Sequence, residues 1–156
     1  MIDRKLTHST FVIERDYRAA PAKVFRAFAD PETKALWFGE PTDEWKLISS
    51  AMDFREGGRE HNEARRGPDG PVSRFDAYYH EIIPDTRIVY SYEMRVDGAR
   101  LSVSLTSIEL KPGANGSGTH LTLTEQGVYF DDLDNSAERE HGTRELLDVL
   151  GDILER

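Results

Sequence analysis

Alternating apolar and polar positions dominate the middle of the chain and predict a run of β-strands between residues 44 and 130. Apolar side chains stand at every second position in residues 75–79 and again in residues 88–92. This two-residue period is typical of strands with one buried face. Asp97-Gly98 is a strong signal for a tight hairpin. With residues 10–17, which alternate in the same way, the pattern predicts about seven strands joined by short turns.

The last two strands of this run are expected to have one wet face. In the first of them the predicted inward side chains are Leu101, Val103 and Leu105, and the predicted outward ones are Ser102, Ser104 and Thr106. In the second, Leu121 and Leu123 are expected to point inward and His120 outward. A hydrophobic-in, polar-out alternation of this kind is common in antiparallel sheets.

Helical spacing of apolar residues appears on both sides of the strands. Pro21 suits the first turn of a helix, which continues through Phe28. Asp30 then caps a second short helix that begins at Pro31 and is expected to end at Gly39. A long final helix is predicted from Ser136 to Leu154, since leucines recur there at helical spacing. The pattern therefore predicts an α+β protein in which one sheet wraps around a terminal helix.

Length and charge narrow the class of protein. The chain has 156 residues and a net charge of −9, which fits a single domain over residues 1–156 and disfavours nucleic acid as a partner. It has no cysteine, so disulfides and thiolate chemistry are excluded. No stretch is long and apolar enough to predict a membrane span, and an anionic membrane surface is disfavoured too. We therefore expect a cytoplasmic protein with no metal and no cofactor.

Three groups of motifs, taken in order, carry a family resemblance. They occupy residues 21–28 with 30–32 and 36–39, residues 53–59, and residues 79–84 with 87–90. Together they resemble the activator of heat-shock-protein-90 ATPase homologue-like family, within the START-like, Bet v-like (SRPBCC) superfamily. The resemblance extends from Phe11 to Leu154.

This resemblance implies a helix-grip fold of β-α-α-β6-α order, in which a curved antiparallel sheet holds a long C-terminal helix. Members of the superfamily usually enclose a cavity between sheet and helix, and many bind hydrophobic ligands there. Some catalyse cyclisation or hydrolysis in the cavity, and the family name comes from a co-chaperone domain. Ligand binding, cavity catalysis and co-chaperone-like interaction are therefore three hypotheses, of which we favour binding of a small apolar or amphipathic molecule.

The candidate ligand-binding residues are mostly aromatic, because ligand pockets are generally lined by apolar and aromatic groups. They are Phe28, Trp37, Phe38, Trp45, Phe75, Tyr79, Tyr90 and Tyr92, joined by Glu60, Asn62, Gly142 and Leu146. For each aromatic residue, plain core packing is the alternative interpretation. Exposed strand edges also make a homodimer conceivable.

Glu60 and Asn62 lie on one face of their predicted strand by alternation. If that face is concave, a buried Glu60 becomes a candidate general acid or base in a cavity enzyme. A shift of one residue would instead turn His61 and Glu63 inward. A purely structural polar pair is a further alternative.

Gly142 interrupts the final helix, where glycine costs about 1 kcal/mol relative to alanine. Close approach of the helix to the sheet, or space left for a ligand, would account for it. The next residue is Thr143, where the family often has tryptophan. A smaller side chain at that position is expected to enlarge the cavity mouth.

Overall fold

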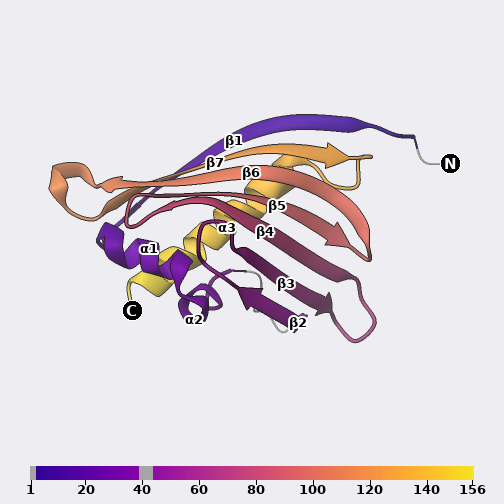
Figure 1. Cartoon of the computed structure of the whole chain (residues 1–156), viewed down its shortest axis with the longest axis horizontal. Helices are drawn as coiled ribbons and strands as arrows, with labels where there is room; N and C mark the ends of the chain where they lie inside the picture. The colour runs from indigo at the N-terminus through magenta and orange to yellow at the C-terminus, as the bar shows by residue number, and fades with distance from the viewer. Residues whose placement is uncertain (1–2, 39–43) are drawn as a thin grey trace.

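The computed structural model describes residues 3–38 and 44–156, which form one curved sheet and the helices on its concave side (Figure 1). The order along the chain is one strand, two short helices, six strands and a long helix. The elements are β1 (Leu6–Tyr17), α1 (Pro21–Ala29), α2 (Pro31–Lys34), β2 (Trp45–Met52), β3 (Arg59–Arg66), β4 (Val72–Ile83), β5 (Arg87–Val96), β6 (Ala99–Pro112), β7 (Thr119–Phe130) and α3 (Ser136–Leu154), with a 3₁₀ turn at Ala114–Gly116.

The strands form a seven-stranded antiparallel sheet in the order β1-β7-β6-β5-β4-β3-β2. After β1 the sheet is a series of hairpins, and β1 pairs with the last strand, β7. The predicted hairpin between β5 and β6 is confirmed, because Asp97 and Gly98 both have positive φ, 50° and 83°. Two positive values are the mark of a type I′ turn, whose twist matches that of the strands.

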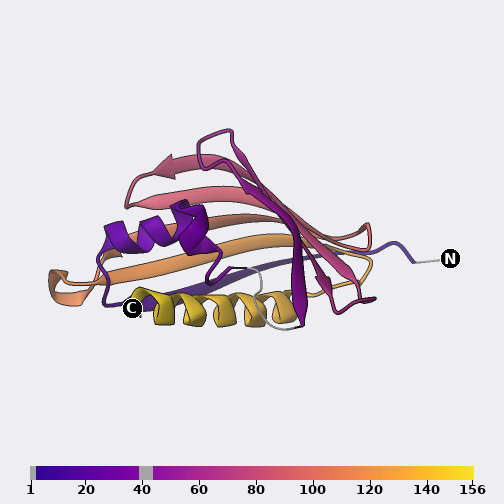
Figure 2. The same cartoon turned by 90° about the horizontal axis from the view of Figure 1, so that it is seen from below.

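All three helices lie against the concave face of the sheet (Figure 2). The long helix α3 runs along the sheet, and α1 and α2 cover one end of the same face. Their buried side chains share one apolar core with the sheet, built around Ile13, Val24, Leu121, Leu147 and Leu150. The core gathers where α1 meets α3, since α1 contributes Val24 and α3 contributes Leu147 and Leu150.

The short helix α2 is shorter than expected. Asp30 caps it as predicted, since its carboxylate accepts a hydrogen bond of 3.1 Å from the Thr33 backbone N–H. The helix ends at Lys34, and residues 35–37 continue as a turn. The predicted end at Gly39 lies outside the described residues.

The expected polarity of β6 is wrong. Ser102, Ser104 and Thr106 are the inward residues, at most 2% exposed, whereas Val103 and Leu105 are about two-fifths exposed on the convex face. The register follows from strand alternation, because Ile108 and Leu110 farther along β6 share the inward face and join the core. The Ser102 and Thr106 hydroxyls meet polar partners inside, which allows their burial. β7 follows the prediction, with Leu121 and Leu123 inward.

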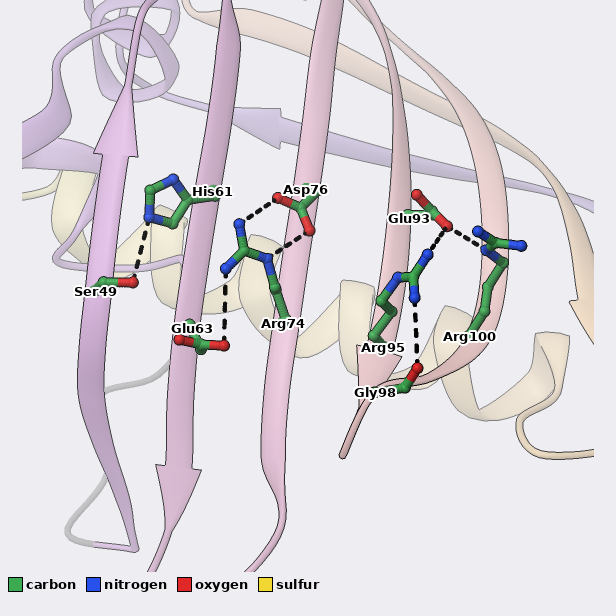
Figure 3. A network of polar contacts seen from close by, with 9 residues as sticks. All are labelled: Ser49, His61, Glu63, Arg74, Asp76, Glu93, Arg95, Gly98 and Arg100. Carbon is green, nitrogen blue, oxygen red and sulfur yellow. Dashed lines mark hydrogen bonds and ion pairs between the residues drawn. The ribbon is translucent and has the colours of Figure 1, made fainter.

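A polar network on the convex face shows which side chains of β3 point outward (Figure 3). His61 Nε2 lies 3.3 Å from the Ser49 hydroxyl, and Glu63 lies 3.8 Å from Arg74. Arg74 also donates a hydrogen bond of 2.8 Å to Asp76 on its own strand. His61 and Glu63 therefore face away from α3, and the alternative with these two residues inward is excluded.

Candidate functional site

A cavity of about 510 Å³ lies between the concave face of the sheet and α3. Every predicted ligand-binding residue except Glu60 and Tyr79 lines it. The lining residues from that prediction are Phe28, Trp37, Phe38, Trp45, Asn62, Phe75, Tyr90, Tyr92, Gly142 and Leu146. The cavity reaches the surface, because its lining also includes the exposed residues Glu44 and Glu138.

One wall of the cavity is a continuous row of aromatic rings. Trp37 meets Phe28 edge-on at 4.9 Å between centroids and Phe38 at 5.7 Å. Phe38 in turn meets Phe75 at 5.0 Å, and Phe75 lies 5.0 Å from Tyr92. Edge-to-face pairs of this kind favour a defined arrangement of the rings. The wall is therefore apolar, and its rings hold one another in place.

The other wall contains a buried carboxylate, Glu125 of β7, which is 2% exposed. The Tyr92 hydroxyl donates to its Oε2 at 2.7 Å, and the Thr106 hydroxyl donates to its Oε1 at 3.3 Å. Burial raises the pKa of Glu125, although these hydrogen bonds and the nearby Arg139 act in the opposite direction. The Ser104 hydroxyl has no hydrogen-bond partner among the described residues.

Arg139 of α3 lies beside Glu125 and is held by several partners. Its guanidinium donates to the Tyr92 hydroxyl at 2.9 Å, to Ser102 at 2.8 Å and to Asp134 at 2.8 Å. It also lies 3.7 Å from Glu125. These contacts explain why Ser102 is buried, and they fix a charged polar cluster at the cavity wall. The cavity polar cluster consists of Tyr92, Glu125, Asp134 and Arg139.

Sequence reasoning missed Glu125, Asp134 and Arg139, although a signal for two of them was present. Glu125 follows Leu123 by two positions on β7, so alternation places it on the inward face. Arg139 precedes Thr143 by four residues, so the helical period places it on the cavity side of α3. Because Glu125 and Arg139 are charged, their residue type favoured the surface. Their positions in the strand and helix periods favoured the interior.

Glu60 is buried, but it belongs to a second polar cluster outside the cavity lining. Lys34 of α2 lies 2.7 Å from its Oε1, and the Tyr79 hydroxyl donates to the same oxygen. Lys34 and Glu60 are both buried, and Lys34 also lies 4.4 Å from the Phe38 ring centroid. Burial lowers the pKa of Lys34, although its contact with Glu60 opposes that shift. The cluster ties α2 to β3 and β4.

Gly142 leaves free volume at the cavity. A Cβ atom built on this residue has no neighbour within 4 Å. Close approach of α3 to the sheet therefore does not account for this glycine. Thr143 beside it also lines the cavity, and its hydroxyl donates to the Arg139 carbonyl at 2.8 Å. A tryptophan at position 143 would project a much larger side chain from the same face of α3.

Replacing Glu125 with glutamine is expected to change how stability depends on pH. In the folded chain the pKa of Glu125 lies above its ordinary value of 4.5. Protonated Glu125 therefore stabilises the fold, and this contribution is fully present below pH 4.5. This stability is lost as pH rises through the higher, folded-state pKa. Glu125→Gln has no such titration. Its free energy of unfolding should therefore improve, relative to the unmodified chain, as pH rises above about 4.5.

Urea denaturation across this pH range measures the effect. Glu145→Gln serves as the control, since Glu145 is exposed on α3 and faces His141 at 2.8 Å. Parallel stability curves for Glu125→Gln and the unmodified chain would show that burial does not perturb Glu125.

A curved antiparallel sheet, two short helices and a long C-terminal helix around a ligand-sized cavity agree with the helix-grip class of protein. The model of the family "Activator of Hsp90 ATPase homolog 1-like protein" matches residues 18–155, so the chain belongs to that family, within the START-like superfamily. This confirms the resemblance inferred from the motifs.

Solved structures agree with this assignment. A protein from Rhizobium leguminosarum is 40% identical, with a TM-score of 0.90 and 99% of each chain covered. The Mll3558 protein from Rhizobium loti is 42% identical, with a TM-score of 0.86, covering 96% of this chain and 99% of its own. An AHSA1-like protein from Aeromonas hydrophila, 19% identical, shares the fold with a TM-score of 0.67 over 94% of this chain and 92% of its own. Comparison with curated proteins gives no significant match.

Among the described residues, no helix combines the length and the apolar character that crossing a membrane requires.

Proposed function

We propose that the chain is a single helix-grip domain that binds a small amphipathic molecule between its sheet and α3. The observation that carries this proposal is the cavity itself, with a row of aromatic rings on one wall and the cavity polar cluster on another. The apolar body of the ligand packs against Phe28, Phe38 and Phe75. Its polar group lies near Glu125 and Arg139.

The size and lining of the cavity support this proposal. Its volume of about 510 Å³ falls within the range of roughly 300–1,000 Å³ that is usual for small-molecule sites. Such sites combine a mainly apolar surface with a few polar groups in fixed positions. Here Tyr92, Thr106 and Arg139 hold Glu125 in place before any ligand enters. Preorganisation of this kind lowers the entropic cost of binding.

The geometry gives less support to the two other hypotheses. A Glu60-dependent enzyme needs a carboxylate that is free to exchange protons with a ligand, but Glu60 lies outside the cavity lining and is compensated by Lys34. Co-chaperone-like interaction is suggested by the family name alone. A cytoplasmic location and a homodimer also stay predictions.

Tryptophan emission is expected to report ligand binding directly. The chain has two tryptophans, Trp37 and Trp45, and both line the cavity. Decanol, a neutral amphiphile, should change their emission along a saturable curve and raise the melting temperature, because a ligand that binds only the folded state stabilises it. Titrations with Trp37→Phe and Trp45→Phe should each remove part of the signal.

A linear, non-saturating response to decanol, with no thermal shift, would contradict the proposal. Mass spectrometry under native conditions provides an independent measurement. It should show one ligand per chain in the presence of decanol, and the same stoichiometry in both tryptophan variants.

A further inference from the structure

The charged groups of the cavity lining are unequal in number. The lining carries four carboxylates, Glu44, Glu125, Asp134 and Glu138, against one cation, Arg139. Among the described residues, neither lysine nor histidine contributes to it. The chain as a whole also carries a net charge of −9.

Ion pairs within and beside the lining leave two of these carboxylates uncompensated. Arg139 is paired with Asp134 at 2.8 Å, and Glu44 lies 3.5 Å from Arg66. Glu125 lies farther from Arg139, at 3.7 Å, and shares it with Asp134. Within the described part of the chain, no cationic side chain lies at ion-pair distance from Glu138. Glu125 and Glu138 therefore determine the electrostatic preference of the cavity.

Hydrogen bonding leads to the same preference. Two hydroxyls already donate to Glu125, yet a carboxylate with two oxygens accepts about four hydrogen bonds. Arg139 has five N–H donors, and three of them are engaged with Tyr92, Ser102 and Asp134. Glu125 therefore keeps free acceptor sites at the cavity wall. Such a site suits a ligand group that donates hydrogen bonds.

The aromatic wall is also suited to a cation. The negative face of an aromatic ring attracts ammonium and guanidinium groups within about 6 Å. Two rings of this wall already have protein cations nearby, with Lys34 Nζ 4.4 Å from the Phe38 centroid and the Arg139 guanidinium 5.6 Å from that of Tyr92. Phe75, Tyr90 and Trp45 add aromatic surface to the lining.

We propose that the cavity selects amphiphiles whose polar group is a protonated amine and rejects those that carry a carboxylate. This inference rests on the proposed function and specifies its ligand class. A carboxylate in the cavity would face Glu125 and Glu138 in surroundings of lower dielectric constant than water, where like charges repel more strongly. An ammonium group at the same place donates hydrogen bonds to the free acceptors and compensates the excess charge.

Three ligands with the same alkyl chain test the proposal: decylamine, decanol and decanoate. Tryptophan emission should give the tightest binding for decylamine and the weakest for decanoate, with a difference in dissociation constant of at least about tenfold between the two. Raising the salt concentration should weaken the preference for the amine, because salt screens the carboxylate at the solvent-exposed Glu138.

Variants locate the preference in the cavity. Glu125→Gln and Glu138→Gln should each reduce the ratio of decylamine to decanoate affinity, and the double variant should abolish it. Glu145→Gln is the matched control, since it removes one negative charge from α3 outside the cavity lining and should leave the ratio unchanged. Should Glu125→Gln fail to fold, the exposed Glu138→Gln provides the decisive comparison.

The two proposals fail in different ways. Decanoate binding as tightly as decylamine, with decanol also bound, overturns the amine preference and leaves small-molecule binding intact. If Glu145→Gln reduces the ratio of decylamine to decanoate affinity as much as the Glu125 and Glu138 variants do, the preference comes from the general surface charge. That result overturns the assignment to the cavity. Absence of saturable binding by all three ligands overturns the proposed function itself, and the inference with it.

Discussion

Lys34→Met is expected to lower the free energy of unfolding by about 3–5 kcal/mol, as is usual when one partner of a buried ion pair is removed. Lys34 lies 2.7 Å from Glu60, and both side chains are less than a tenth exposed. Methionine keeps the apolar part of the lysine side chain, but it leaves the Glu60 carboxylate buried with the Tyr79 hydroxyl as its one hydrogen-bond partner among the described residues. α2 then also loses its tie to the sheet.

Urea denaturation of Lys34→Met and of Lys34→Met/Glu60→Gln measures this effect. The double variant should recover more than half of the loss, because a neutral amide still accepts from Tyr79 and leaves no uncompensated charge. Arg144→Met is the control, since it removes a pair with Glu140 at 2.7 Å that is partly exposed and should cost at most about 1 kcal/mol. If Lys34→Met costs no more than Arg144→Met, the Lys34–Glu60 pair does not contribute to folding as its burial implies.

Gly142→Leu is expected to weaken ligand binding strongly while leaving the chain at least as stable as before. A side chain at this position enters open space at the cavity lining, so leucine occupies volume that the ligand needs. Leucine is also a better helix former than glycine by up to about 1 kcal/mol. This gain offsets the free energy that is lost when the leucine side chain becomes ordered. Decanol affinity, measured by tryptophan emission, should fall at least about tenfold.

Gly142→Ala is the matched control for this variant. It provides most of the same gain in helix propensity with a single added methyl group, so it should raise the free energy of unfolding by about 1 kcal/mol and retain decanol binding. Loss of stability in both variants would show that the backbone at Gly142 needs glycine. Unchanged decanol affinity in a stable Gly142→Leu would place the ligand elsewhere.

Much of the architecture follows from local patterns in the sequence. Alternation in residues 75–79 and 88–92 predicted strands whose inward side chains are indeed Phe75, Tyr79 and Tyr92. Turn chemistry placed the hairpin at Asp97-Gly98, and Asp30 caps α2 by accepting from the Thr33 backbone N–H at 3.1 Å. These features depend on neighbours in the chain, so a sequence pattern is sufficient to predict them. The sequence left the inward position of Asn62 open, because a shift of one residue reverses the two faces of a strand.

The polar half of the site depended on contacts between distant segments. On β6 the hydroxyl residues are inside and Val103 and Leu105 outside, because Ser102 meets Arg139 of α3 and Thr106 meets Glu125 of β7. Lys34 similarly becomes a buried partner of Glu60 only when α2 packs against β3. A polar side chain alone in the sequence is expected in water, since burial without a partner is costly. Only the tertiary structure brings its partner to it, and so only the tertiary structure decided which polar residues face the cavity.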